Sequence, residues 1–156
     1  MLKALKNLFD LVTDAGQAPP NAERRPLHVA IASLLNEARR IHAGNASPER
    51  AAAVVALQDL CGLDAAAAQA LLAETGERAA RLTSYFRPVG VIRRGLSPEE
   101  RVRFVEQLWR IAYADGRLDP VEDQFVRKIA DLLYVPNTQS MLARNRARGG
   151  DSAAKG

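Results

Sequence analysis

Four carboxylates stand close together in the segment ADGRLDPVED, and their types and spacing could do chemistry. They are Asp115, Asp119, Glu122 and Asp123. Carboxylate oxygens are the ligands that hard divalent cations prefer in proteins, so one hypothesis is a metal-binding site. However, Ca²⁺ takes about six to eight oxygen ligands, and the segment lacks the D-x-[DN]-x-[DN]-G spacing of an EF-hand loop.

The same residues have a second interpretation, which is the start of a helix. Asp119 precedes Pro120, and Glu122 stands three residues after Asp119, which is the spacing of a capping box. Gly116 suits the left-handed position that follows many helices. Capping accounts for Asp119 and Glu122 without a metal, so we prefer it and keep a divalent metal site as the alternative.

No other group of residues predicts a catalytic centre. The histidines are His28 and His42, and without an H-E-x-x-H motif we expect no zinc site. Cys61 lies in the apolar run VVALQDLCGL, without a basic neighbour to stabilise a thiolate. The sequence contains neither a G-x-S-x-G motif nor a glycine-rich phosphate loop. We therefore expect no enzymatic activity, and no cofactor apart from the alternative metal.

Composition and charge favour a helical protein with no specific affinity for nucleic acid. Hydrophobic residues make up 47% of the chain and aromatic residues only 5%, which suits helices packed through Ala and Leu. The net charge of +4 is too small to imply nucleic acid or membrane by itself. We expect two arginine clusters to be solvated faces: Arg87, Arg93 and Arg94, and Arg144, Arg146 and Arg148.

Apolar residues recur with helical spacing along most of the chain, and no segment alternates as a strand would. We therefore predict an all-α fold. Its expected parts are an amphipathic leader helix over residues 1–13, a linker over 14–25, a helical domain over 26–144 and a disordered basic tail over 145–156.

Six helices are expected within the domain, which with the leader makes about seven. They begin at Pro26, Ser47, Asp64, Ser97, Asp119 and Thr138. The third runs towards Tyr85 until Pro88 and Gly90 interrupt it, and the last ends at Arg144. Trp109 lies on the apolar stripe of the fourth helix, so we expect it to be buried.

The leader places apolar residues on one face and lysines on another. The apolar residues are Leu5, Leu8, Phe9 and Val12. Three docking sites remain open for this helix: the domain itself, a protein partner or a bilayer surface. No run approaches the ~20 apolar residues that span a bilayer, and the N-terminus lacks the pattern of a secretory signal.

A weak internal repeat appears when the chain is shifted by 72 residues. The shift places Gly44 on Gly116 and Pro48 on Pro120. It predicts two helical hairpins around one pseudo-two-fold core. The carboxylates occur in the second copy only, because Ala43, Ser47 and Arg50 stand where the second copy has Asp115, Asp119 and Glu122.

The segment LWRIAYADGRLDPVEDQFVRKIADLLYVP resembles the second signature of the TerB-like family of tellurite resistance proteins. EARRIHAGNASPER resembles a degenerate form of the first signature, and the likeness extends from about Leu27 to Leu142. The resemblance implies an all-helical domain of about seven helices, a fold shared with the N-terminal domain of DjlA co-chaperones. It implies a role in bacterial stress response and no established reaction.

We therefore expect a non-enzymatic helical module that acts through protein or membrane-surface contacts in a bacterial tellurite-resistance-type stress response. The expected partners are proteins of a stress-response complex, with weak membrane contact through residues 1–12 as a further possibility. We expect a cytoplasmic location, or a peripheral one at the inner membrane. The alternative function is a metal-binding or metal-sensing domain that uses the segment ADGRLDPVED.

Overall fold

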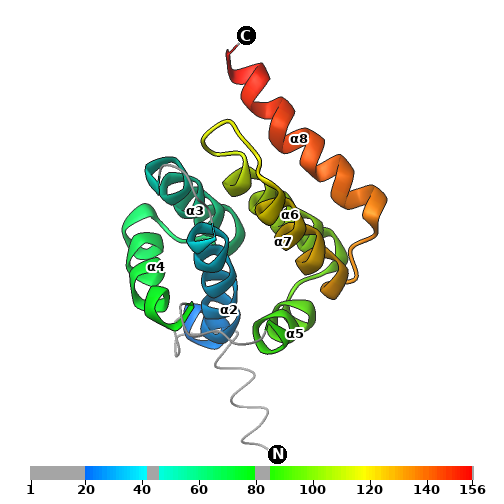
Figure 1. Ribbon diagram of the computed structural model, residues 1–156. Coiled ribbons are helices and arrows are strands. Elements are labelled where there is room, and N and C mark those ends of the chain that lie inside the picture. Colours follow the sequence, from blue (N-terminus) through cyan, green and yellow to red (C-terminus); the bar gives the residue numbers. More distant parts are fainter. Residues whose placement is uncertain (1–19, 42–45, 80–84, 156) are drawn as a thin grey trace, which may run out of the picture.

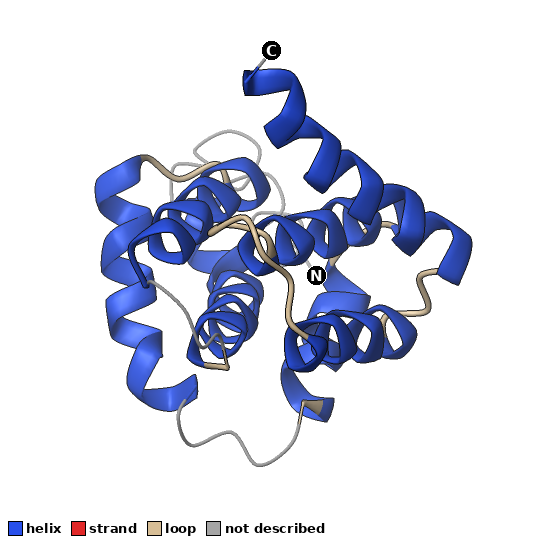
Figure 2. Cartoon of the chain, turned by 45° about the horizontal axis from the view of Figure 1, so that its top comes forward, coloured by secondary structure: helices blue, strands red, loops and turns tan. Residues whose placement is uncertain are grey.

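The computed structural model describes residues 20–41, 46–79 and 85–155, and within these ranges it contains α-helices and no strand (Figures 1 and 2). The all-α prediction is therefore confirmed. The helices are α2 (Pro20–Arg40), α3 (Ala46–Cys61), α4 (Ala65–Ala79), α5 (Phe86–Gly95), α6 (Pro98–Ala112), α7 (Pro120–Leu132) and α8 (Asn137–Lys155).

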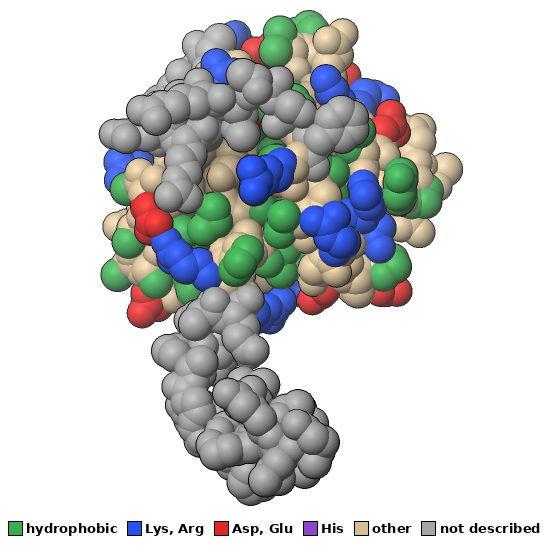
Figure 3. All heavy atoms as spheres, turned by 90° about the horizontal axis from the view of Figure 1, so that it is seen from below, with side chains coloured by type: hydrophobic (Ala, Val, Ile, Leu, Met, Phe, Trp, Pro, Cys, Tyr) green, Lys and Arg blue, Asp and Glu red, His purple; other side chains and the backbone are tan. Residues whose placement is uncertain are grey.

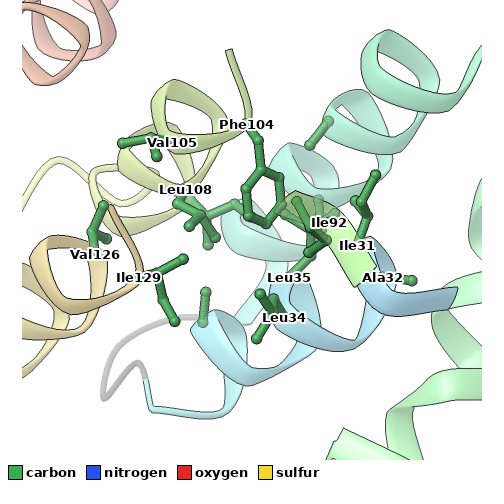
Figure 4. Close-up of a cluster of buried hydrophobic side chains, with 14 of the residues drawn as sticks. Ile31, Ala32, Leu34, Leu35, Ile92, Phe104, Val105, Leu108, Val126 and Ile129 are labelled. Atoms are coloured by element: carbon green, nitrogen blue, oxygen red, sulfur yellow. The ribbon is translucent and has the colours of Figure 1, made fainter. Parts of the chain in front are cut away.

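One hydrophobic core lies between the helices. Leu34 and Leu35 of α2 face Phe104 and Leu108 of α6, and Ile92 of α5 closes the same cluster (Figure 4). These side chains are fully buried. Many of the remaining core positions are alanines, which let helices approach closely and explain how a chain poor in aromatic residues fills its interior.

The predicted repeat extends to a third helix in each copy. A shift of 72 residues places Ala65, the start of α4, on Asn137, the start of α8. Within each copy the first helix packs against the third, α2 against α4 and α6 against α8. Contacts of α6 with both α2 and α3 join the two three-helix units, and α5 connects them along the chain.

Helix α5 was not predicted: Pro88 and Gly90, which we expected to interrupt the third helix, lie inside this separate helix. Pro88 is the third residue of α5, where a backbone N–H would have no acceptor within the helix, so its missing donor costs little. Val89 and Ile92 are buried on the core side, and their burial outweighs the low helix propensity of Gly90.

The predicted linker 14–25 is too long at its C-terminal end. Helix α2 begins at Pro20, and Pro26 lies inside it. Arg24, Arg25 and Pro26 are exposed, and the apolar stripe starts only at Leu27, so hydrophobic periodicity could not reveal this first part of the helix. The leader 1–13 and residues 14–19 lie outside the described residues.

The last helix is longer than predicted, since α8 continues from Arg144 to Lys155 through residues that we expected to be disordered. Ser140, Ala143 and Ala147 form a buried stripe on α8 at helical spacing. This stripe faces α6. Side chains this small contribute little to a hydrophobic pattern, so the tail 145–156 lacked a visible apolar face in the sequence.

Candidate functional site

The acidic segment connects α6 to α7, and Asp119 is the N-cap of α7. Its Oδ1 accepts hydrogen bonds from the backbone N–H groups of Val121 at 2.9 Å and Glu122 at 3.0 Å. In return, the Asp119 N–H donates to Oε1 of Glu122 at 3.4 Å. The predicted capping box is therefore confirmed, with Pro120 as the first helical residue.

The other two carboxylates of the segment have local interactions of their own. Oδ1 of Asp115 accepts from the backbone N–H of Arg117 at 3.1 Å, across Gly116, whose φ of +88° favours glycine. Asp123 forms an ion pair with Arg127 one turn along α7, at 3.0 Å. Asp115 thus holds the turn before α7, and Asp123 faces along the helix.

Asp119 and Glu122 are the only two of the four carboxylates that these interactions bring together. In the described part of the chain, no three His, Cys, Asp or Glu side chains form a group that could hold a metal ion. Glu122 is 2% exposed. The geometry supplies a helix start, and a metal site at Asp115, Asp119, Glu122 and Asp123 stays a prediction.

Cys61 and His28 are both buried. Cys61 is buried, and burial raises the pKa of its thiol to about 12, so the thiolate is disfavoured at neutral pH. His28 is buried between α2 and α4, and burial, followed by the charges of Arg24 and Arg25, lowers its pKa. His42 lies outside the described residues.

A buried carboxylate that the sequence analysis missed is Glu37 of α2, which is 1% exposed. It accepts two hydrogen bonds from Arg40, at 2.8 and 2.6 Å, and one from the Tyr85 hydroxyl at 2.9 Å. Burial alone would raise the pKa of Glu37, but these hydrogen bonds and the Arg40 charge lower it overall. Its position between Leu34 and Ile41 on the core-facing stripe was the available signal.

A groove runs between α3 and α6 and consists of two adjoining hollows of about 360 and 280 Å³. Val55, Gln107 and Arg110 line both hollows. Val55 is 55% exposed, on a helix that also contributes to the core. The remaining lining residues are Pro48, Ala51, Ala52, Asp59, Arg103, Glu106 and Ala114.

Polar contacts hold the walls of this groove in place. Asp59 of α3 accepts from Arg103 at 2.6 Å and from Gln107 at 3.1 Å, both on α6. Glu106 pairs with Arg110 at 2.8 Å and with Arg146 of α8 at 2.6 Å. Burial would raise the pKa of Glu106, but the hydrogen bonds from the two arginines lower it overall. These contacts link α3, α6 and α8 around a groove that has both apolar and charged side chains in its lining.

The two predicted arginine clusters have different surroundings. On α8, Arg144 lies over the Trp109 ring at 6.0 Å, and Arg146 belongs to the ion pair of the groove wall. On α5, Arg93 lies over the ring of Tyr134 at 4.9 Å. No single helix in the described ranges is long and apolar enough to cross a bilayer; α3 and α4 meet the test only together, across a bend of 110°.

Comparison with known proteins gives one result. A family model described as "Tellurite resistance protein TerB" matches residues 28–145, which are most of the chain and include every helix from α3 to α7. No match was found among curated proteins or among solved structures. The match covers most of both copies of the helical repeat, together with the acidic segment and the groove between α3 and α6. The chain therefore belongs to the TerB family of tellurite resistance proteins.

Proposed function

We propose that this protein is a non-enzymatic interaction module in a bacterial tellurite-resistance-type stress response, and that it binds a protein partner in the groove between α3 and α6. Family membership supports the type of response. The proposed binding site rests on one observation, which is the exposure of Val55 in the middle of this groove. We place this activity in the cytoplasm.

The groove fits one helix of a partner, with an apolar stripe and charged flanks. Ala51, Ala52 and Val55 offer an apolar floor on α3, one to two turns long. On the opposite wall, Arg103 and Arg110 keep about half and a third of their side chains exposed, so partner carboxylates could reach them. Helix-in-groove recognition uses this combination of an apolar stripe with polar flanks.

Co-purification of the full-length protein from its native cells tests this proposal. Val55→Asp places an unpaired charge on the groove floor, and we expect it to lose partners that the wild type retains. Val121→Asp is the matched control, because Val121 is similarly exposed, at 59%, but lies at the start of α7. Circular dichroism should show that both variants remain folded. Equal recovery of partners by Val55→Asp and the wild type would contradict the proposal.

The metal-binding or metal-sensing alternative uses Asp115, Asp119, Glu122 and Asp123. No described contact favours it over capping, and it is tested by the ion-dependent melts given in the Discussion.

A further inference from the structure

Tyr134 occupies a backbone position that normally belongs to glycine. Its φ is +60°, and the shift of 72 residues that relates the two copies places it on Gly62, whose φ is +70°. In the second copy, the Val135 N–H donates to the Ala130 carbonyl at 2.9 Å and so closes the end of α7. Glycine is the usual residue at the left-handed position of such a helix end, because a Cβ is crowded there.

The strained tyrosine does not contribute to the core. Its side chain is 70% exposed, and the Arg93 guanidinium lies over its ring at 4.9 Å. Arg93 also donates to the Leu132 carbonyl at 3.3 Å, which fixes the guanidinium at the end of α7. A strained residue whose aromatic ring faces solvent indicates a function other than stabilising the fold.

Helix α5 presents a basic stripe beside Tyr134. Arg87, Val91 and Arg94 follow at helical spacing on its outer side, whereas Val89 and Ile92 are buried. In the described ranges, neither Arg87 nor Arg94 pairs with an acidic side chain, so both charges are available to a partner. Figure 3 shows the end of the molecule to which α5 belongs: Lys and Arg side chains gather with hydrophobic ones near its centre, and Asp and Glu lie towards the rim.

The same end of the molecule contains the start of α2. In Figure 1 this start, α5 and the end of α7 lie together, away from the C-terminus, and α5 contacts both other helices. The chain before α2 includes the predicted amphipathic leader, with Leu8 and Phe9 on its apolar face. One short amphipathic helix with two lysines binds lipid weakly, so stable attachment requires a second signal.

We propose that Arg87, Val91, Arg93, Arg94 and Tyr134 form a basic face that docks on an anionic phospholipid bilayer, with the leader as the second attachment. Arginines at a membrane surface are attracted to anionic headgroups, and tyrosine prefers the interface between headgroups and acyl chains. Val91 is half-buried against the core and adds a partly exposed apolar surface between the two arginines. This inference is independent of the groove between α3 and α6.

Vesicle flotation of the full-length protein tests the basic face. The vesicles contain phosphatidylcholine with or without phosphatidylglycerol, and we expect binding only to the anionic ones, weakened by added salt. The double variant Arg87→Gln/Arg94→Gln should lower partitioning about fivefold for each arginine removed. Arg117→Gln/Arg148→Gln is the matched control: it removes the same charge from exposed arginines outside α5 and should change partitioning less.

Tyr134→Gly separates binding from folding, because glycine already occupies the equivalent position in the first copy. We expect this variant to stay folded and to partition less than the wild type. Phe9→Asp in the full-length chain should weaken partitioning as well, through the leader. Val55→Asp should float like the wild type, so a failure of the groove proposal would not be mistaken for a failure of this one.

Several outcomes would overturn the assignment. They are a wild type that does not float with anionic vesicles, a Tyr134→Gly variant that floats equally well, and equal losses in the two double-arginine variants. A loss confined to Phe9→Asp would assign membrane binding to the leader alone. The protein could also bind a polyglutamate peptide more tightly than it binds vesicles, with the same dependence on Tyr134. That result would identify the partner as an acidic protein segment and would contradict binding to a bilayer.

Discussion

The Tyr85 hydroxyl donates a hydrogen bond to the buried carboxylate of Glu37 at 2.9 Å and so ties the start of α5 to α2. Tyr85 also packs edge-on against Phe125 of α7, with ring centroids 5.5 Å apart. One aromatic residue therefore joins three helices around a carboxylate that the sequence placed on a core-facing stripe.

Glu37 should make stability depend on pH in the acid range. Its pKa in the folded protein is below the ordinary value of 4.5. The ionised carboxylate therefore stabilises the folded protein fully above pH 4.5, and this stabilisation is lost as the pH falls through the folded-state pKa. We expect Glu37→Gln to lower the free energy of unfolding at pH 7 by about 1.5–3 kcal/mol, since charged hydrogen bonds are lost. Urea unfolding at pH 7 and at descending pH measures this. If the variant and the wild type lose stability in parallel on acidification, Glu37 is not the group responsible.

Trp109 should be a major contributor to stability, because its side chain is fully buried and its indole N–H donates to Ser140 Oγ at 3.3 Å. The predicted burial of Trp109 is confirmed. We expect Trp109→Ala to lower the free energy of unfolding by about 3–5 kcal/mol, the range for large aromatic core truncations. Chemical denaturation gives this value, and Tyr113→Ala, at a partly exposed site beyond α6, is the comparison. A change within about 0.5 kcal/mol for Trp109→Ala would contradict the packing of α8 on α6.

Asp119 should stabilise the protein as a helix cap, with or without divalent ions. We expect Asp119→Ala to cost about 1 kcal/mol and Asp119→Ser to restore most of it, since serine caps helices as well. Thermal melts of the wild type and both variants, in chelator and in millimolar calcium, magnesium or zinc, give the result.

A metal site would behave differently in the same melts. Bound ion would stabilise the wild type by about 2.7 kcal/mol at a hundredfold excess over its Kd, and serine could not replace the carboxylate ligand. An ion-dependent rise in the wild-type Tm that both variants lose would make Asp115, Asp119, Glu122 and Asp123 a functional site.

Tyr134→Gly should raise the stability of the protein by about 1 kcal/mol, because it relieves a side chain held in a left-handed conformation. The reciprocal change, Gly62→Ala, should lower stability by about 1 kcal/mol for the same reason. No neighbouring atom lies within 4 Å of a Cβ added at Gly62, so the cost would come from the backbone alone. Thermal melts of both variants measure the two effects, and a destabilised Tyr134→Gly would show that the ring supports the fold after all.

Local chemistry made the starts of α6 and α7 predictable from the sequence. Ser97, a predicted helix start, forms a capping box with Glu100, in which the Ser97 N–H donates to Glu100 at 2.8 Å, and Asp119 and Glu122 form the capping box predicted for α7. Capping requires contacts only within one helical turn, and the apolar stripes of α2, α6 and α7 require only the helical period. The same rules favoured helix capping over metal binding for the acidic segment, so the local geometry of this candidate site could also be predicted from the sequence.

Contacts between distant residues decided the rest. Helix α5 forms in spite of Pro88 and Gly90 because α2 buries its apolar side, and α8 continues past Arg144 because α6 receives Ala143 and Ala147. The groove at Val55 exists only where α3 meets α6, and Tyr134 meets Arg93 only because α7 ends beside α5. The sequence by itself determined where α3, α4, α6, α7 and α8 begin and which faces of α2, α6 and α7 are apolar, since those depend on neighbours along the chain. Which polar and aromatic side chains share a surface was decided by tertiary packing, because their partners lie tens of residues away in the sequence.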